Sequence, residues 1–305
     1  MGKVLITPRS LTRERHPAFS LIEEAGHEIV TSTPGVQPSE EELLTLVGDI
    51  EGYLAGVEKI SAKVLEAAEN LKVIGRNGAG IDNVDLEAAE RLNIKVRPTP
   101  GANAQGVAEL TISLIFSLLR WIPFSDAYLK SQEWKRKKGM EVEGKTLGLI
   151  GCGDIGQKVA VMASALGMKV KAYRRTPDKS FAPANFSWSP EEEVLSTSDI
   201  VSLHCPAGEK PLIDAAAVAS MKKGAYLINT ARAAVIDEKA VYDGLESGQL
   251  SGYAMDVFPQ EPPQDYTLVK HESVIATPHI GGFTKESVDR ATTGAIEQIL
   301  EEMNG

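Results

Sequence analysis

The feature that most constrains this chain is a glycine-rich turn between an apolar run and a segment with helical periodicity. Residues 145–156 read KTLGLIGCGDIG, in which Gly151, Gly153 and Gly156 follow a short apolar stretch. The pattern predicts a buried strand, a tight turn and a helix. This arrangement places the pyrophosphate of a dinucleotide on a helix N-terminus. An ordinary strand-to-helix turn is the alternative, because a glycine motif of this kind is weak by itself.

A second informative position lies about 20 residues further on, where NAD-binding turns of this type are followed by an acidic residue. Here the predicted strand Lys169–Tyr173 is followed by Arg174 and Arg175, and no carboxylate stands at its end. Two guanidinium groups suit the 2′-phosphate of NADP, which they bind through charge-assisted hydrogen bonds. The alternative is a pair of solvated arginines on a loop. The sequence therefore predicts a preference for NADP(H), with NAD(H) as a possible second cofactor.

Predicted strands and helices alternate along nearly the whole chain of 305 residues, a length that suits two domains. Pro98, Pro100 and Gly101 interrupt the alternation and mark a crossing between domains. An apolar helix over 104–121 follows, and its hydrophobicity on all sides predicts burial at an interface rather than one wet face. An amphipathic helix over 284–303 is expected to fold back onto the first domain. The predicted domains are residues 1–99 with 284–305, and residues 100–283.

Alternation of this kind predicts an α/β protein with two doubly wound parallel sheets, each covered by helices on both faces. The predicted strands of the first block are residues 3–7, 27–31, 52–55, 72–75 and 94–97.

Composition narrows the class of protein further. Apolar residues make up 43% of the chain, and the formal net charge of −10 argues against nucleic acid or an anionic membrane as a partner. The apolar stretch 110–119 is too short to span a bilayer, and the N-terminus lacks the apolar core of a signal peptide. The two cysteines, Cys152 and Cys205, suggest neither a disulfide framework nor a metal site. A cytoplasmic protein without a bound metal is expected.

Three predicted strands of the second block end next to a residue with catalytic potential. Because the carboxyl ends of parallel strands meet at one edge of a sheet, these residues should lie close together. The strands and the residues that follow them are Ala225–Asn229 with Arg232, Gly252–Met255 with Glu261, and Val274–Ala276 with His279.

An arginine, a carboxylate and an imidazole suffice for hydride transfer between a nicotinamide and a 2-keto or 2-hydroxy acid. Arg232 could hold the substrate carboxylate and polarise its carbonyl group. His279 could deliver a proton to the carbonyl oxygen near neutral pH, and Glu261 would favour the protonated ring. A lone histidine after a strand is more often structural, so the hypothesis depends on all three residues together.

These motifs resemble those of the D-isomer-specific 2-hydroxyacid dehydrogenases of the phosphoglycerate dehydrogenase type, over almost the full chain. The resemblance implies a Rossmann-type nucleotide domain inserted into a flavodoxin-like substrate domain, an oxidoreductase acting on a CH–OH group, and a homodimer. The segments that carry it are NGAGIDNVDLEAA (77–89), the glycine turn (151–156), INTARAAVIDE (228–238), AMDVFPQEP (254–262) and TPHIGGFT (277–284).

The resemblance also implies roles for single residues. Arg232, Glu261 and His279 correspond to the catalytic arginine, glutamate and histidine of the family. The substrate carboxylate would be bound by backbone amides of Asn77, Gly78, Ala79 and Gly80, next to Arg76. Beside the three glycines and Arg175, the nucleotide contacts would fall on Asp154, Ile155, Arg174, Cys205, Ala231 and Asp256.

The sequence departs from the family pattern in the turn after the strand at 52–55, where phosphoglycerate enzymes have an arginine. Here the turn reads Gly56-Val57-Glu58-Lys59. A substrate phosphate would have to rely on Arg76, Lys59 or an Arg136 supplied by a second subunit. Ala233, where many relatives have glycine, is a smaller departure that leaves the guanidinium of Arg232 in place.

The leading hypothesis is therefore an NADP(H)-preferring reductase of hydroxypyruvate-like or glyoxylate-like 2-keto acids. D-3-phosphoglycerate dehydrogenase is the enzymatic alternative. A non-catalytic nucleotide-sensing protein resembling the C-terminal-binding co-repressors is the alternative of another class, because a fold does not determine a function.

Overall fold

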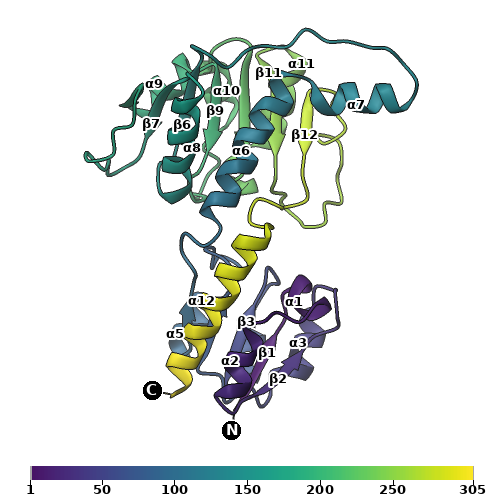
Figure 1. The fold of residues 1–305 in the computed structure, drawn as a ribbon, viewed down its shortest axis with the longest axis vertical. Coiled ribbons are helices and arrows are strands. Elements are labelled where there is room, and N and C mark those ends of the chain that lie inside the picture. Colours follow the sequence, from purple (N-terminus) through teal and green to yellow (C-terminus); the bar gives the residue numbers. More distant parts are fainter. Residues whose placement is uncertain (1, 305) are drawn as a thin grey trace. The chain divides into compact units, whose positions relative to one another are not determined.

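The computed structural model describes residues 2–304, which form two compact units (Figure 1). Unit 1 comprises Met1–Asn103 and Thr284–Gly305, and unit 2 comprises Ala104–Phe283. The chain leaves unit 1 after Asn103, whereas the sequence placed this boundary after residue 99. Each unit contains one parallel sheet with helices on both faces, so the predicted fold class is confirmed.

Unit 1 is built on a five-stranded sheet with the order β2-β1-β3-β4-β5, which is the flavodoxin-like order. Its strands are β1 (Lys3–Ile6), β2 (Glu28–Thr31), β3 (Gly52–Ala55), β4 (Val73–Arg76) and β5 (Lys95–Arg97). Its helices are α1 (Arg9–Arg13), α2 (Phe19–Glu24), α3 (Glu40–Leu46), α4 (Ala62–Ala67), α5 (Leu86–Arg91) and α12 (Lys285–Asn304). The helix α1 was not expected from the sequence.

The C-terminal helix α12 packs against β3 and β4 and completes one apolar layer of unit 1. Ile296 and Ile299 are fully buried there. Glycine makes this close approach possible: a Cβ added to Gly75 would lie 2.8 Å from the carbonyl oxygen of Ala295. The last 20-residue helix is thus part of the core of the first unit, although it comes about 180 residues after the rest of that unit.

Unit 2 is built on a seven-stranded parallel sheet with the order β12-β11-β10-β9-β6-β7-β8. Its strands are β6 (Thr146–Ile150), β7 (Lys169–Tyr173), β8 (Phe186–Trp188), β9 (Ile200–Leu203), β10 (Ala225–Asn229), β11 (Leu250–Met255) and β12 (Val274–Ala276). Its helices are α6 (Ala104–Leu119), α7 (Ile122–Lys130), α8 (Asp154–Ala165), α9 (Glu191–Thr197), α10 (Ala215–Ser220) and α11 (Glu238–Glu246), with the 3₁₀ turn η1 (Ala233–Val235).

The strand order of unit 2 reverses between β6 and β9, as in Rossmann-type sheets. The chain adds β7 and β8 on one side of β6 and then β9 to β12 on the other. Ligands of open parallel sheets bind at such a reversal, beyond the carboxyl ends of the strands. The turn after β6 is the glycine turn, so the topology places it at the expected position for a dinucleotide.

The helix α6 has one polar face that is exposed within unit 2, and the expected burial of this helix at an interface stays a prediction. It packs on α8, β10, β11 and β12, and its residues Leu114 and Leu118 are buried. Glu109 and Ser113 are exposed on the opposite side. Among residues 2–304, no single helix is long and apolar enough to cross a membrane; α6 and α7 reach that length and composition only as a pair bent by 63°.

Replacing Ile299 by alanine should destabilise unit 1, because it leaves a cavity between α12 and the sheet. We expect a loss of about 2–5 kcal/mol in the local free energy of unfolding. Hydrogen exchange measures this loss. The amides of β3 and β4 should exchange faster, while those of β10 in unit 2 should exchange at the same rate. Glu301→Ala, an exposed change on the same helix, is the control and should stay within about 0.5 kcal/mol. Unchanged exchange in Ile299→Ala would contradict the packing described.

Candidate active site

The three predicted catalytic residues follow adjacent strands of unit 2. The strands β10, β11 and β12 are hydrogen-bonded neighbours, and all three run parallel. Arg232 comes shortly after β10, Glu261 after β11 and His279 after β12. The structure therefore places these residues in loops at one edge of one sheet, as the sequence predicts.

His279 and Glu261 form an ion pair. The ring nitrogen Nδ1 of His279 lies 2.8 Å from Oε1 and 2.7 Å from Oε2 of Glu261. The backbone amide of Phe258 also donates to Oε1 of Glu261, at 3.3 Å. Because Nδ1 is engaged by the carboxylate, Nε2 is the nitrogen that remains to meet a substrate.

The electrostatic surroundings of His279 favour its protonated form. The hydrogen bond to Glu261 is the main cause that raises the pKa of His279, and the charges of Glu261 and Asp256 act in the same direction. Burial and the positive charge of Arg232 oppose them. The imidazole consequently stays protonated to higher pH than an isolated histidine would, which suits a proton donor.

The backbone of His279 is in the left-handed region, with φ of 53°. This conformation is uncommon for residues other than glycine and persists only where surrounding contacts hold it. Those contacts come from Asp256, a fully buried carboxylate at the end of β11. Its Oδ1 accepts from Thr277 Oγ1 (2.6 Å) and from the amide of Ile280 (2.8 Å), and its Oδ2 accepts from the amide of Gly281 (2.7 Å).

Asp256 thus binds the segment on both sides of His279. The sequence proposed Asp256 as a nucleotide contact, and that role stays a prediction. Its function as an anchor was missed, since the three donors lie more than 20 residues further along the chain. An aspartate at a strand end carries no signal of which loop it binds.

Arg232 is held by its own loop and by Asn229. The buried amide of Asn229 donates to the carbonyl of Arg232 at 3.0 Å and accepts from the amide of Ala231 at 3.0 Å. The Nη1 atom of Arg232 donates to the carbonyl of Ala231 at 2.8 Å. Asn229 is a further positioning residue that the sequence interpretation did not single out.

The glycine turn has the geometry that a pyrophosphate requires. Gly151 has φ of 91°, and a Cβ there would lie 2.5 Å from the backbone of His204. A Cβ on Gly156 would lie 2.5 Å from the carbonyl oxygen of Gly151. Gly153, the N-cap of the 12-residue helix α8, has open space around its Cβ position. Two glycines allow close packing and the third leaves a cradle at the helix N-terminus, followed by Asp154 and Ile155.

The cysteines near this turn are not poised for thiolate chemistry. Cys152 is fully buried, and burial raises the pKa of its thiol to about 12. Burial also raises the pKa of the half-buried Cys205, at the end of β9. Cys152 belongs to the apolar core of unit 2, and the nucleotide contact expected of Cys205 stays a prediction.

Arg174 and Arg175 are both exposed, and Arg174 contacts the glycine turn. The Nη1 atom of Arg174 is 3.4 Å from the carbonyl oxygen of Cys152. The guanidinium is close enough to oppose, by its charge, the effect of burial on the Cys152 thiol. It stands at the end of β7, where the ribose of a dinucleotide would lie.

The Arg76–Gly80 loop belongs to unit 1 and follows β4. Arg76 is buried, and its guanidinium donates to the carbonyls of Ala55 (2.8 Å) and Gly80 (2.9 Å). The amide of Asn77 donates to Ala55 and that of Gly78 to Thr99 Oγ1. No acceptor among residues 2–304 takes the amides of Ala79 and Gly80, so these two could bind a carboxylate. The buried guanidinium of Arg76 thus connects this loop to the end of β3.

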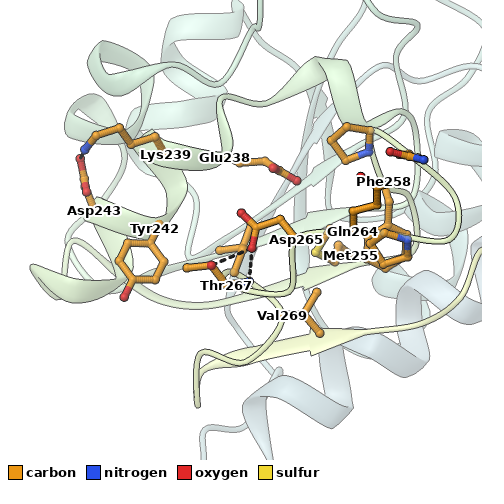
Figure 2. A pocket seen from close by; sticks show the side chains of 14 residues that line it. Glu238, Lys239, Tyr242, Asp243, Met255, Phe258, Gln264, Asp265, Thr267 and Val269 are labelled. Atoms are coloured by element: carbon orange, nitrogen blue, oxygen red, sulfur yellow. Dashed lines mark hydrogen bonds and ion pairs between the residues drawn. The ribbon is translucent and has the colours of Figure 1, made fainter.

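A cavity of about 630 Å³ lies behind the Glu261 loop in unit 2 (Figure 2). Its lining comes from α11 and residues 255–269, and the carboxylates of Glu238 and Asp265 point into it. Burial, and then the charge of Asp265, raises the pKa of Glu238. None of the predicted catalytic residues lines this cavity. Among residues 2–304, no group of three histidine, cysteine or acidic side chains could hold a metal ion.

Comparison with known proteins gives consistent matches. The sequence model described as "D-isomer specific 2-hydroxyacid dehydrogenase, NAD binding domain" matches residues 112–281. D-3-phosphoglycerate dehydrogenase of Homo sapiens is 41% identical over 274 residues, which cover 88% of this chain and 51% of the human protein. Hydroxypyruvate reductase of Thermotoga maritima is 39% identical over 272 residues, covering 87% of this chain and 88% of that protein.

Solved structures agree with these matches. A protein from Thermus thermophilus superposes with a TM-score of 0.90 at 35% identity, covering 99% of this chain and 97% of that protein. The chain spans about half the length of the curated phosphoglycerate dehydrogenases that it matches.

Replacing Glu261 by glutamine should lower the pKa of His279, because the hydrogen bond to a charged carboxylate is the main cause of its elevation. An NMR titration of the His279 ring measures this shift directly and needs no substrate. Glu246→Gln is the matched control: Glu246 lies 3.2 Å from the Nε2 atom of His271, so its removal should leave His279 unchanged. An unaltered His279 titration in Glu261→Gln would contradict the description of the pair.

Proposed function

Because the chain belongs to the D-isomer-specific 2-hydroxyacid dehydrogenases, we propose that it reduces small 2-keto acids with a nicotinamide dinucleotide. The observation that carries the proposal is the His279–Glu261 pair, with Nε2 left to meet a substrate, next to Arg232 at the ends of neighbouring strands. A protonated imidazole and a guanidinium are the two groups that reduction of a carbonyl next to a carboxylate requires.

In the proposed mechanism, His279 gives the proton on Nε2 to the carbonyl oxygen of the substrate. Glu261 holds the ring through Nδ1 and stabilises its positive charge. In the reverse direction, neutral His279 takes the hydroxyl proton. Reduction therefore slows as the pH rises through the elevated pKa of His279, and oxidation becomes faster over the same range.

The substrate carboxylate would be bound by positive charge and by backbone amides. Arg232 offers fixed donors that also polarise the carbonyl group. In unit 1, the amides of Ala79 and Gly80 are the available donors of the loop after β4. These assignments account for both reactive features of the substrate, which are its acid group and its carbonyl.

The nucleotide would bind with its pyrophosphate on the turn of Gly151, Gly153 and Gly156. Bound there, a nicotinamide dinucleotide supplies or accepts the hydride. Asp154, Ile155, Cys205, Ala231 and Asp256 remain proposed contacts. Arg174, beside the turn, and Arg175 favour NADP(H) over NAD(H), because their charges suit a 2′-phosphate. We further propose a homodimer, as the family resemblance implies, and a cytoplasmic location, because the two cysteines suggest no disulfide framework.

D-3-phosphoglycerate dehydrogenase is the second candidate, favoured by the 41% identity with the human enzyme. A substrate phosphate needs a cation, and the candidates are Arg76, Lys59 and an Arg136 supplied by a second subunit. Arg76 is buried and donates to the carbonyls of Ala55 and Gly80. The internal use of its guanidinium is the reason for preferring an unphosphorylated substrate.

Initial rates with hydroxypyruvate, glyoxylate and 3-phosphohydroxypyruvate, each with NADPH and with NADH, test the proposal. We expect the unphosphorylated acids and NADPH to give the highest kcat/KM. Arg174→Ala should raise the KM for NADPH about tenfold, because it removes a charge-assisted contact, while the KM for NADH changes little. Lys179→Ala, which removes an exposed charge of the same loop, is the control. Preference for the phosphorylated acid with NADH would favour the second candidate.

His279→Asn should lower kcat by about 10²- to 10⁴-fold, because the proton donor is lost. Asparagine tolerates the left-handed backbone at this position, so the fold should persist. Binding of the nucleotide, measured by fluorescence titration, should be unchanged and serves as the internal control. A variant that keeps most of its turnover would refute the role of His279.

A further inference from the structure

A buried carboxylate stands in the turn after β3 of unit 1, outside the residues discussed so far. Glu58 is 2% exposed. Its Oε1 atom accepts hydrogen bonds from the hydroxyl of Tyr53 (3.0 Å), the amide of Gly56 (2.9 Å) and Thr7 Oγ1. Burying a carboxylate is costly unless donors compensate for the lost water, and here three donors converge on one oxygen.

The second oxygen of Glu58 is placed differently. Within residues 2–304, no donor is directed to Oε2. A Cβ added to Gly56 would lie 2.7 Å from Oε2 and 3.1 Å from the Cα of Pro8. The carboxylate therefore occupies the space that a side chain at position 56 would need. Because position 56 is glycine, this place in the turn holds the acceptor oxygen of Glu58.

A phenol and a guanidinium lie near this turn. Burial, and then the charge of Glu58, raises the pKa of Tyr53, so the phenol stays a neutral donor. The nearby guanidinium of Arg76 donates to the carbonyls of Ala55 and Gly80. Oε2 consequently has acceptor capacity to offer to a ligand.

The turn is tied to the loop that we propose for the substrate carboxylate. The side chain of Asn83, which follows that loop, donates to the carbonyls of Glu58 (2.5 Å) and Gly56 (3.3 Å). The amide of Asn77 donates to Ala55, the last residue of β3. Both segments thus lie at the carboxyl edge of adjacent parallel strands, where open sheets bind ligands.

We propose that Glu58 is a specificity-determining residue that selects the distal group of the substrate. Its Oε2 atom accepts a hydrogen bond from an uncharged hydroxyl group and repels a phosphate at the same place. The substrate class is then a short hydroxylated 2-keto acid without a phosphate. This inference rests on the proposed function, and it assigns the discrimination to a residue that is present rather than to a missing cation.

The test compares kcat/KM for hydroxypyruvate, pyruvate and 3-phosphohydroxypyruvate in wild type, Glu58→Gln and Glu69→Gln. Glutamine keeps an acceptor for the three buried donors and removes the charge. Glu69 is an exposed acid of the same unit, so its variant has the same net charge. We expect the ratio of phosphorylated to unphosphorylated acid to rise about tenfold in Glu58→Gln only. In wild type, hydroxypyruvate should exceed pyruvate about tenfold.

These ratios separate specificity from stability, because the fraction of folded enzyme affects both kcat/KM values equally and cancels from their ratio. An unchanged ratio in Glu58→Gln would show that Glu58 only anchors its turn, and equal use of hydroxypyruvate and pyruvate would overturn the hydroxyl contact. If wild type turns over none of the three acids, the proposed function itself fails, and the inference with it.

A measurement on wild type alone covers the case in which the variant does not fold. Raising the salt concentration from about 0.05 to about 0.5 M screens charge repulsion. The relative kcat/KM for the phosphorylated acid should then rise. A fall would indicate that a cation attracts the phosphate and would overturn the proposal.

Discussion

The hydrogen bonds of the Asp256 carboxylate are the constraint on which the candidate active site depends. They join the end of β11 to the segment that follows β12, on both sides of His279. A carboxylate that is 2% exposed is stable only with such donors, and the donors in turn fix the left-handed backbone of His279. Glu261 belongs to the loop that follows the same strand, where the amide of Phe258 donates to its carboxylate. Glycine suits the close approach, because a Cβ on Gly281 would lie only 3.0 Å from Oδ2.

Unit 1 uses the same principle at its own sheet edge. Arg76 and Glu58 are buried charged groups at the ends of β4 and β3, and backbone groups take part in satisfying both. Arg76 donates hydrogen bonds to the carbonyls of Ala55 and Gly80. Glu58 accepts hydrogen bonds through Oε1 and has no donor directed to Oε2 within residues 2–304. Because all strands of a sheet are parallel, these loops gather at one edge without any contact between them being specified locally. Loops held by such contacts suit the proposed binding of a small acid.

Much of the fold could be read from local pattern. The strands Lys169–Tyr173, Ala225–Asn229 and Val274–Ala276 begin and end where the apolar runs do, since turn residues bound them. The helix α6 shows the limit of this approach: its apolar residues predicted burial at an interface, which stays a prediction because Glu109 and Ser113 form an exposed face within unit 2. The helix α1 was missed because five residues after a proline carry too little periodicity. The return of the chain into unit 1 was expected from the amphipathic sequence of the last helix, and the packing of α12 on Gly75 gives it a physical basis.

By itself, the sequence determined the fold class, the glycine turn and the three residues that follow β10, β11 and β12, because each depends on local periodicity and spacing. Only the tertiary structure decided that Nδ1 of His279 faces Glu261, that Asp256 anchors the loop around it, and that Arg76 is turned inward. It also decided that Glu58 is buried with one oxygen unused. The physical reason is that these contacts join residues about 20 or more positions apart, apart from the closer partners of Glu58 and Arg76. Which atom of a side chain meets which partner is set by packing, and packing leaves no periodic trace in the chain.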